Sequence, residues 1–513
     1  TQADAIADAT SGIVTAATIT ADTAAALNAA LNDSGLQINA YSLTVSDSGT
    51  TLASDLTSLD GKTTVAVNAA AVTAISGSAT EVAAAYAANT ATTISGLGNE
   101  NVTITGTTVA TLAELKAINN ATSGTLTLNA QSISADYSGL VVDVKDAFAG
   151  ITTQTGKITL TDTSVSVADI NAVAPVTSGV VTATITSGAA SVLKALTTTS
   201  TDAITMTVNA EAASAATAAG DLVSLNGNTN QIITMTAVSS VSGSYADLLD
   251  IYVTNKTQYT GIGDETVTIV GTVSATQADA IADVTSGVVT ATIDADTASA
   301  LNAALSDAQV NAYTLTISAG SAVATDLTSL DSKTSVAVNA AAVTVITGSA
   351  TEVAAAYAAN PTTGITGLGN ENVEITGTTV ATLEELKAIN NATSGTITLN
   401  AQSISADYSG LAADVKAAFA GITTQTGKIT LTDATVSVAD INTVAGVTSG
   451  EVIATVTSAA ASVLNGLTTT STDAITMTVN AEAASAATQA SDLVSLNGKT
   501  NQVITMTAVT KVS

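Results

Sequence analysis

The sequence predicts an α/β repeat protein, an elongated right-handed parallel β/α solenoid whose coils run strand, corner, strand and helix. Three observations support this prediction. A strand-and-helix phrase at residues 157–186 returns at residues 428–457. Each phrase reaches its next strand within about 22 residues, so a parallel neighbour is the simplest place for that strand. Thr-Ser-Gly turns precede predicted strands throughout the chain, and internal repeats of this kind are typical of solenoids.

The first phrase defines one predicted coil. Ile and Leu alternate with Thr at 158–161, the period of two that indicates a half-buried strand, and residues 162–163 form a corner. A second alternation at 165–167 predicts another short strand. Residues 168–173 fit one face of a helix, which Pro175 ends.

The next strand begins near Val180, and we expect it to lie parallel beside the strand at Ile158. Gly446 in the second phrase stands where Pro175 stands in the first. Both residues break a helix, so this position has a structural role. The right-handed turn of the coil follows from the general rule for parallel crossovers.

Internal repetition predicts two domains, a first solenoid unit at 1–275 and a second, incomplete copy at 276–513. Residues 1–8 recur at 276–283, and from about residue 58 onward the offset is 271, as for Glu114 and Glu385. The pattern starts and stops within a coil, and no atypical capping coil is visible. Since solenoids normally carry such caps, we expect a segment of a longer array or ends covered by neighbours.

Predicted strands and turns recur along both copies. The Thr-Ser-Gly turns begin at Thr10, Thr122, Thr177, Thr285, Thr393 and Thr448. Core strands are predicted to begin near Ile13, Ile38, Thr64, Val102, Thr125, Ile158, Val180, Ile204, Ile232 and Val267 in the first copy. In the second copy they are predicted near Val288, Tyr313, Val336, Val373, Thr396, Ile429, Val452, Ile475 and Val503.

Ala-rich amphipathic segments between the strands predict short helices. Four of them open with a capping box, in which a Ser or Thr side chain and a Glu three residues later bond the exposed amides of the first turn. The four boxes are Ser78–Glu81, Thr111–Glu114, Ser349–Glu352 and Thr382–Glu385.

Missing residue types limit the chemistry. The chain has no His, Cys, Trp or Arg, and its 12 Lys oppose 42 Asp and Glu, for a net charge of −30. The absence of His and Cys removes the usual nucleophile–base pairs, zinc sites and thiol redox centres. The absence of Arg removes the bidentate phosphate clamp. Strong negative charge repels nucleic acid and anionic membranes. We therefore expect a protein that is not an enzyme, with no nucleic-acid partner.

Composition also bears on location. A cysteine-free, acidic chain suits an extracellular or cell-surface environment. No run of 18 or more apolar residues is present, so we expect no membrane insertion. There is no initiating Met and no signal peptide. We therefore expect either that these were removed or that the chain is an excerpt of a longer protein.

Three Gly-x-Gly-Asn/Asp-Glu stretches are the candidate metal sites, with calcium as the candidate ion and no other cofactor expected. Oxygen ligands on a glycine-rich turn suit a hard cation. The alternative is a tight turn with positive φ at Gly and polar residues facing water. The candidate ligands are Asn99, Glu100, Asp264, Glu265, Asn370 and Glu371.

Thr-x-Thr rows form a second candidate surface. Stacked in parallel strands they would make a flat hydroxyl grid, as in ice-binding proteins. The alternative is that Thr is a polar residue with good β propensity. The rows are Thr159/Thr161, Thr182/Thr184, Thr205/Thr207 and Thr234/Thr236.

Acidic residues of the first phrase and their repeats form a third set. We expect them to serve as solvated faces and helix caps, with calcium between neighbouring chains as the alternative. Asp146 becomes Ala417 in the second copy, so that charge is dispensable. The set is Asp136, Asp143, Asp146, Asp162 and Asp169.

Tyrosines form the last set. Tyr245, Tyr252 and Tyr259 are seven residues apart, which predicts a shared helix face, and core packing is a more common use of such a stripe than ligand binding. Tyr137 and Tyr408 are predicted at matching helix starts, where they pack locally.

The Thr-Ser-Gly-Val-Val-Thr-Ala-Thr-Ile and Ser-Val-Ala-Asp-Ile-Asn phrases and the Ala/Thr/Val-rich composition resemble the giant repetitive cell-surface proteins of marine unicellular cyanobacteria. The resemblance covers the whole chain in style and composition and carries no functional residue over. It implies secretion, an extracellular structural role and calcium dependence.

The predicted function is therefore structural: a subunit or segment of an extracellular filament, sheath or surface layer, assembling with other copies head-to-tail or laterally through stacked coils. The alternatives are a calcium-dependent adhesin stalk and an ice-binding surface protein. A carboxylate-based glycan hydrolase is a third class, but it needs paired carboxylates in a groove and aromatic residues for sugar stacking, and aromatics make up 2% of the chain.

Overall fold

The computed structural model describes residues 1–513 apart from 17, 33–36, 236, 361–363 and 484–485. It is a mixed α/β protein whose described strand pairs are parallel. The chain divides into two compact units, Thr1–Ile262 (unit 1) and Gly263–Ser513 (unit 2). The repeat boundary predicted from the sequence lies slightly later, between residues 275 and 276.

The strands of unit 1 are short. They are β1 (Thr15–Ala16), β2 (Ala40–Tyr41), β3 (Thr50–Leu52), β4 (Val67–Asn68), β5 (Ala74–Gly77), β6 (Ile94–Ser95), β7 (Asn101–Ile104), β8 (Leu126–Thr127), β9 (Tyr137–Gly139), β10 (Ile158–Leu160), β11 (Val181–Thr184), β12 (Gly188–Ala189), β13 (Ala203–Asn209), β14 (Thr217–Ala218), β15 (Ile233–Thr234), β16 (Ser240–Gly243) and β17 (Tyr259–Thr260).

Helices alternate with these strands. They are α1 (Gln2–Ala7), α2 (Ala24–Ala30), α3 (Ala53–Asp60), α4 (Ala79–Thr90), α5 (Leu112–Ala121), α6 (Ala130–Ser134), α7 (Val141–Ala147), α8 (Val167–Val173), α9 (Ala190–Leu193), α10 (Ala219–Asn226) and α11 (Tyr245–Leu249). The shorter helical turns are η1 (Ala174–Val176), η2 (Ala212–Ser214), the π-helical η3 (Asp250–Thr254) and η4 (Lys256–Gln258).

Unit 2 repeats this order. Its strands are β18 (Thr266–Val273), β19 (Val289–Ile293), β20 (Ala312–Thr314), β21 (Gly320–Val323), β22 (Val338–Asn339), β23 (Val343–Gly348), β24 (Ile365–Thr366), β25 (Asn372–Ile375), β26 (Ile397–Thr398), β27 (Tyr408–Gly410), β28 (Ile429–Leu431), β29 (Val452–Thr455), β30 (Ala459–Ala460), β31 (Ala474–Thr476) and β32 (Val479–Asn480). Its helices are α12 (Ala275–Ala282), α13 (Ala298–Ala304), α14 (Ala324–Lys333), α15 (Ala350–Ala359), α16 (Leu383–Ala392), α17 (Ala401–Ser405), α18 (Ala412–Ala418), α19 (Val438–Ala445), α20 (Ala461–Leu464) and α21 (Ala490–Asn497).

Each strand of a sheet pairs with the strand of the next strand–helix segment along the chain. In unit 1 the main sheets run β3-β5-β7-β8 and β9-β10-β11-β13-β15-β17. In unit 2 they run β21-β23-β25-β26 and β27-β28-β29-β31. The predicted pairing of the strands at Ile158 and Val180 is confirmed, since Ile158 and Thr159 are the parallel partners of Val181 and Thr182.

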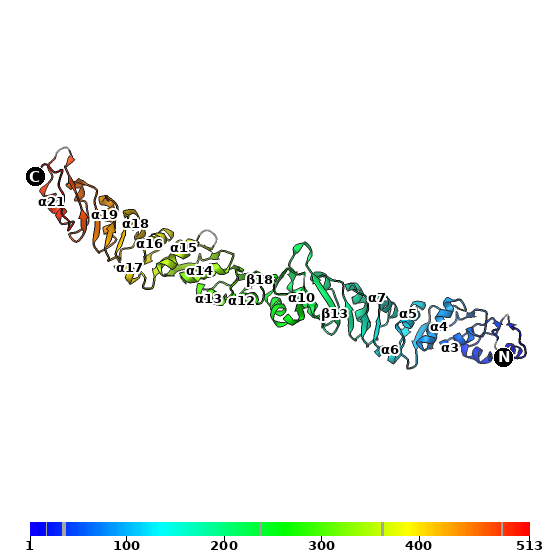
Figure 1. Ribbon diagram of the computed structural model, residues 1–513. Coiled ribbons are helices and arrows are strands. Elements are labelled where there is room, and N and C mark those ends of the chain that lie inside the picture. Colours follow the sequence, from blue (N-terminus) through cyan, green and yellow to red (C-terminus); the bar gives the residue numbers. More distant parts are fainter. Residues whose placement is uncertain (17, 33–36, 236, 361–363, 484–485) are drawn as a thin grey trace. The chain divides into compact units, whose positions relative to one another are not determined.

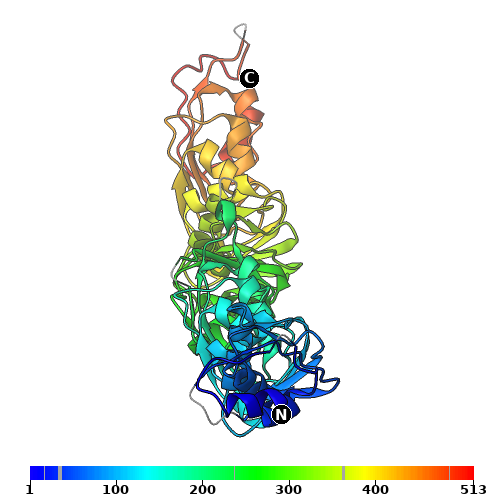
Figure 2. The same cartoon turned by 90° about the vertical axis from the view of Figure 1, so that its right-hand side faces the viewer.

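Helices of successive segments also contact one another. In unit 1, α3 packs on α4, α4 on α5, α5 on α7 and α7 on α8. The labels α3, α4, α5 and α7 follow one another in Figure 1. In unit 2, α14 packs on α15, α15 on α16, α16 on α18 and α18 on α19. Figure 2 shows the helices and strands from a second side. Their buried faces are Ala, Val, Leu and Ile, with Tyr86 in α4 and Tyr357 in α15 as the exceptions.

The capping boxes predicted from the sequence are confirmed. The side chains of Ser78, Thr111, Ser349 and Thr382 each accept a hydrogen bond from the amide of a Glu three residues later, and each Glu bonds back. The helix predicted at 168–173 is also confirmed as α8, which η1 follows at Pro175.

Several local predictions are wrong. The second strand expected at 165–167 reduces to a single bridge between Val165 and Ile185, because Val167 already begins α8. No strand forms at Val503, since the nearest pairing is a bridge from Thr505 to Thr478. The remaining predicted strands coincide with a described strand or begin within a few residues of one.

The tyrosine predictions hold for packing and fail for secondary structure. Tyr259 lies in β17, so it shares no helix face with Tyr245 and Tyr252. Tyr252 and Tyr259 are buried in the core, as expected. Tyr137 and Tyr408 lie in strands β9 and β27 rather than at helix starts. Their rings pack edge-on against Phe148 and Phe419 at 5.0 Å between centroids.

Candidate functional site

The glycine corner at 96–100 joins β6 to β7. Gly96 and Gly98 have φ of 91° and 152°, values that favour glycine, and a side chain at Gly96 would come within 2.7 Å of the Ala70 backbone. The positive φ expected of a tight turn is therefore confirmed. The corners at 261–265 and 367–371 have the same positive φ at both glycines.

The glutamate of each corner points into the protein. Glu100 is 0% exposed. Both of its carboxylate oxygens accept hydrogen bonds from the Gly98 amide, at 3.0 and 2.9 Å, and one accepts from the Tyr86 hydroxyl at 3.0 Å. Burial, followed by the charge of Glu100, raises the pKa of Tyr86 far above its usual value, so this tyrosine keeps its proton and remains a donor.

The corner at 367–371 repeats this arrangement, and the corner at 261–265 repeats the bond from the turn amide. In unit 2, Glu371 accepts from the Gly369 amide at 3.0 and 2.8 Å and from the Tyr357 hydroxyl at 3.2 Å. Glu265 is also buried and accepts from the Gly263 amide at 2.8 Å. A buried carboxylate needs hydrogen-bond partners to offset its lost hydration. The turn amide provides one at each corner, and a tyrosine hydroxyl from the preceding helix provides another at Glu100 and Glu371.

The neighbouring candidate ligands lie outside. Asn99, Asp264 and Asn370 are exposed, whereas the glutamate that follows each of them is buried. The two candidate ligands of each corner therefore have different surroundings, and the glutamate is engaged within the turn. Among the described residues, no group of three acidic side chains is arranged to hold a metal ion. Calcium binding remains a prediction.

The Thr-Ser-Gly turns close through the threonine hydroxyl. Thr177 donates to the Gly156 carbonyl of the preceding segment at 2.7 Å and accepts from its own Gly179 amide at 2.8 Å. Thr122 does the same with Glu100 and Gly124, at 2.7 and 2.9 Å. The same pair of bonds occurs at Thr285, Thr393 and Thr448.

The glycine of this motif lets two segments approach closely. A Cβ at Gly124 would lie 2.2 Å from the Glu100 carbonyl oxygen, and one at Gly179 would lie 2.5 Å from that of Gly156. Other turns use a threonine without the glycine, a feature that sequence analysis missed. These threonines, which also donate to a carbonyl of the preceding segment, are Thr63, Thr229, Thr334 and Thr500.

The threonine rows do not align as one grid. Thr159 pairs with Thr182, but Thr182 then pairs with Ala203, and Thr184 pairs with Thr205. The threonine rows of β11 and β13 are therefore offset by two residues relative to each other. Thr236 lies outside the described residues.

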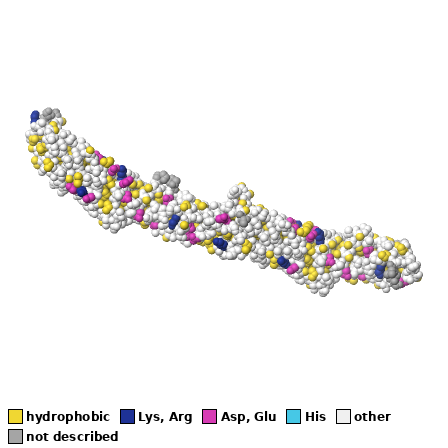
Figure 3. Space-filling view, viewed as in Figure 1, with side chains coloured by type: hydrophobic (Ala, Val, Ile, Leu, Met, Phe, Trp, Pro, Cys, Tyr) yellow, Lys and Arg dark blue, Asp and Glu magenta, His cyan; other side chains and the backbone are white. Residues whose placement is uncertain are grey.

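Acidic side chains connect successive segments. Lys116 pairs with Asp143 at 2.5 Å and with Asp146 at 3.3 Å, and Lys145 pairs with Asp169 at 2.9 Å. Asp162 accepts from the Val141 amide, the first residue of α7, at 2.7 Å. The expectation of caps is confirmed for Asp162, whereas Asp169 accepts from the hydroxyl of Ser166, the residue that caps α8. On the face shown in Figure 3, lysine and carboxylate side chains lie beside one another.

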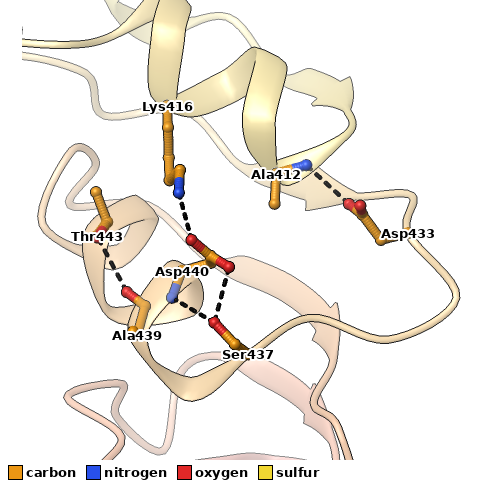
Figure 4. Close-up of polar contacts among 7 residues, drawn as sticks. All are labelled: Ala412, Lys416, Asp433, Ser437, Ala439, Asp440 and Thr443. Atoms are coloured by element: carbon orange, nitrogen blue, oxygen red, sulfur yellow. Dashed lines mark hydrogen bonds and ion pairs between the residues drawn. The ribbon is translucent and has the colours of Figure 1, made fainter.

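Figure 4 shows the equivalent contacts in unit 2. Asp433 accepts from the Ala412 amide at 2.7 Å, and Lys416 pairs with Asp440. Asp440 also bonds Ser437, which caps α19. The Lys416 ammonium, followed by the Ser437 hydroxyl, lowers the pKa of Asp440. Helix α18 begins after Leu411, whose side chain cannot cap, so the carboxylate comes from the next segment.

A shallow hollow of about 370 Å³ lies beside Pro175, Thr199 and Asp202. Asp202 is its one lining carboxylate, and it accepts from the Val181 and Thr199 amides at 2.7 Å each. This hollow therefore lacks the paired carboxylates that glycan hydrolysis needs.

Searches for matching family models, curated proteins and solved structures gave no match to this chain. Within the described parts of the chain, no helix has both the length and the apolar character required to cross a bilayer.

Proposed function

We propose that this chain is a structural segment of an extracellular filament, sheath or surface layer, not an enzyme. Each unit acts as an elongated right-handed β/α solenoid whose coils are the strand–helix segments described above. Other copies of the chain are its partners, joined through stacked coils.

One observation carries this proposal: contacts between successive segments recur in both units. Thr80 donates to Glu114 at 2.6 Å, and Thr351 donates to Glu385 at 2.6 Å. The Lys116–Asp143 pair recurs as Lys387–Asp414. These polar side chains connect one coil to the next, as expected of a repeat array in which each repeat contacts only its neighbours.

Further support comes from composition. A protein without Cys, His and Arg keeps few chemical options for catalysis, and its net charge of −30 suits exposure to a salty exterior. The resemblance to repetitive cell-surface proteins implies the same location.

Electron microscopy of the purified chain over a range of concentrations tests the proposal. Fibres or sheets that lengthen with concentration are expected, and single particles at every concentration would contradict it. Two controls separate the alternatives. Thermal hysteresis would indicate ice binding, and assembly that disappears with a calcium chelator and returns with calcium would indicate a calcium-dependent stalk.

A further inference from the structure

More than half of the residues that line the hollow beside Pro175 are serine or threonine. Its volume of about 370 Å³ is at the lower end of the usual range for small-molecule sites, about 300–1,000 Å³. The exposed hydroxyl side chains of its lining are Ser178, Thr197, Thr199 and Thr201. The hollow therefore has room for a small polar molecule that is larger than a single ion.

Asp202 fixes the orientation of two of these hydroxyl groups. Asp202 is 6% exposed, and one of its carboxylate oxygens accepts from the Thr199 amide at 2.7 Å and from the Thr199 hydroxyl at 3.1 Å. An ionised carboxylate only accepts, so the Thr199 proton points to Asp202. The Thr199 and Thr201 hydroxyl oxygens are 2.7 Å apart, and Thr201 is therefore the donor of that bond. Thr201 is left with only lone pairs to offer a ligand.

Asn171 fixes a third hydroxyl group in the same way. Its amide oxygen accepts from the Thr197 amide at 2.9 Å and from the Thr197 hydroxyl at 3.1 Å, and its amide nitrogen donates to the Ala195 carbonyl at 2.7 Å. The Thr197 proton is thus used within the protein, and this hydroxyl also has only lone pairs to offer. The hollow consequently presents hydrogen-bond acceptors, which select a ligand that donates.

This acceptor character limits the class of ligand. None of the described residues that line the hollow is basic, so a carboxylate or phosphate group would lose its hydration without compensation. Calcium takes roughly six to eight oxygen ligands, with several carboxylates among them. Asp202 is the single carboxylate here, and its two oxygens already accept from the Val181 and Thr199 amides. A neutral polyol, whose hydroxyl groups can all donate, matches the lining better than either ion.

The opposite wall of the hollow is apolar, since Ala174 and Pro175 also line it. Sites for small molecules usually combine such a wall with a few fixed polar groups. A pyranose ring has hydroxyl groups around its edge and C–H groups on its faces. It can therefore meet both surfaces at once, with its edge toward the threonines and one face on Pro175.

We propose that this hollow binds one pyranose unit of a neutral glycan. Hydroxyl groups of the sugar donate to the Oγ1 atoms of Thr197 and Thr201, and one face of the ring lies on Pro175. Because a single carboxylate lines the hollow, the glycan is bound without being hydrolysed. The inference goes beyond the proposed structural function, since this ligand is not another copy of the chain.

The hydroxyl arrangement recurs in unit 2, where residues 468–473 are identical in sequence to 197–202. Thr470 donates to Asp473 at 3.2 Å, and the Thr470 and Thr472 hydroxyl oxygens are 2.6 Å apart. Gly446 stands where Pro175 stands in unit 1, so this copy lacks the proline ring. We therefore expect the unit 1 site to bind the sugar more tightly than the unit 2 site.

Nuclear magnetic resonance of the full chain with labelled threonine methyl groups tests the proposal. The probes are the methyl α-glycosides of glucose, galactose and mannose, with glucuronate as an anionic comparison. At least one neutral probe should shift the Thr197 and Thr199 methyl signals saturably, with a dissociation constant on the order of 1–10 mM, as expected for a ligand of about a dozen non-hydrogen atoms. Glucuronate should leave these signals unshifted.

Thr201→Val combined with Thr472→Val should weaken binding roughly three- to tenfold, the net effect of one neutral hydrogen bond. Thr201→Ser with Thr472→Ser keeps the hydroxyl groups and should retain the affinity. Ser200→Ala with Ser471→Ala is the matched control, because Ser200 is adjacent to Thr201 but is not among the described residues that line the hollow. Unshifted threonine methyl signals elsewhere in the chain confirm that each variant is folded.

Three outcomes would overturn the inference. The first is the absence of a saturable shift with all three neutral probes. The second is equal binding of glucuronate, or calcium chloride shifting the same signals in place of the sugars, since the hollow would then be an ion site. The third is unchanged affinity in the valine variant. Failure to form fibres in microscopy would leave this result unaffected, so the two proposals can fail separately.

Discussion

A threonine hydroxyl and a glycine without a side chain together close the Thr-Ser-Gly turns at Thr122, Thr177, Thr285, Thr393 and Thr448. At Thr122 the hydroxyl donates to the Glu100 carbonyl and accepts from the Gly124 amide. The side chain is 9% exposed, so both bonds are largely shielded from water. Gly124 is needed because the two backbones approach too closely for any side chain.

Gly124→Ala should lower the free energy of unfolding by about 1–3 kcal/mol, the usual cost of forcing an extra carbon into a packed site. The urea midpoint of unfolding measures it. Gly220→Ala, in the first turn of α10, is the matched control in the same unit, because a Cβ there would meet only the Asp247 carboxylate, at 3.8 Å. Alanine in a helix stabilises the folded protein by about 0.5–1 kcal/mol relative to glycine, so this control should not lower the free energy of unfolding. Equal midpoints for the two variants would refute this account of the turn.

Thr80→Val tests the carboxylate at the start of α5. Burial raises the pKa of Glu114, but hydrogen bonds from the Thr80 hydroxyl and from the amide and hydroxyl of Thr111 outweigh it, and the pKa lies below its usual 4.5. Because the folded-state pKa is depressed, the stabilisation is present above pH 4.5 and disappears as the pH falls through the folded-state pKa.

We therefore expect Thr80→Val to be less stable than the original protein at neutral pH by less than about 1 kcal/mol, since the site is partly exposed. The difference should shrink as the pH falls below 4.5. Urea unfolding of the two proteins at several pH values measures it, and Thr80→Ser, which keeps the hydroxyl, is the control. A difference that stays constant with pH would show that Glu114 is not the group involved.

At the scale of elements, several helices receive their cap from the following segment. Leu140 and Leu411 precede α7 and α18 and have no capping side chain, so Asp162 and Asp433 accept the first amide of each helix. The dipole at a helix start favours such a carboxylate. A carboxylate of one segment thus stabilises a helix of the preceding segment, and this contact joins the two segments.

Asp433→Ala should destabilise unit 2 by about 0.5–2 kcal/mol, the usual cost of losing a helix cap. Hydrogen exchange should quicken at the Ala412 amide and in the first turn of α18. Asp146→Ala in unit 1 is the control, since Ala417 occupies that position in unit 2 and exposed ion pairs contribute about 0–1 kcal/mol. Unchanged exchange at Ala412 would contradict the capping role.

The sequence predicts these elements well where the signal is local. Capping boxes and the strand at Ile158 depend on neighbouring residues and are found as predicted. Features between segments were missed because their partners are distant in the chain. Asp433 belongs to a set that was expected to cap helices, but the helix it caps begins 21 residues before it. The Tyr86 donor 14 residues before Glu100 and the stagger of Thr184 against Thr205 were also missed. One signal could have indicated these turns. It is a threonine that recurs about 22 residues after a strand residue, such as Thr63 after Tyr41.

At the scale of the whole molecule, the central claim is that successive segments stack in parallel register within each unit. The two copies supply an internal comparison, because Thr184 pairs with Thr205 in unit 1 and Thr455 pairs with Thr476 in unit 2. No native cysteine interferes with engineered pairs.

Disulfide formation between paired cysteines tests this claim most directly. Thr184→Cys with Thr205→Cys, and Thr455→Cys with Thr476→Cys, should cross-link readily under mild oxidation, because parallel partners lie about 4.8 Å apart and disulfides require Cα atoms within about 7 Å. Thr159→Cys with Thr205→Cys, two strands apart, should remain reduced. Rapid cross-linking of the distant pair, or none in either register pair, would contradict the stacked arrangement.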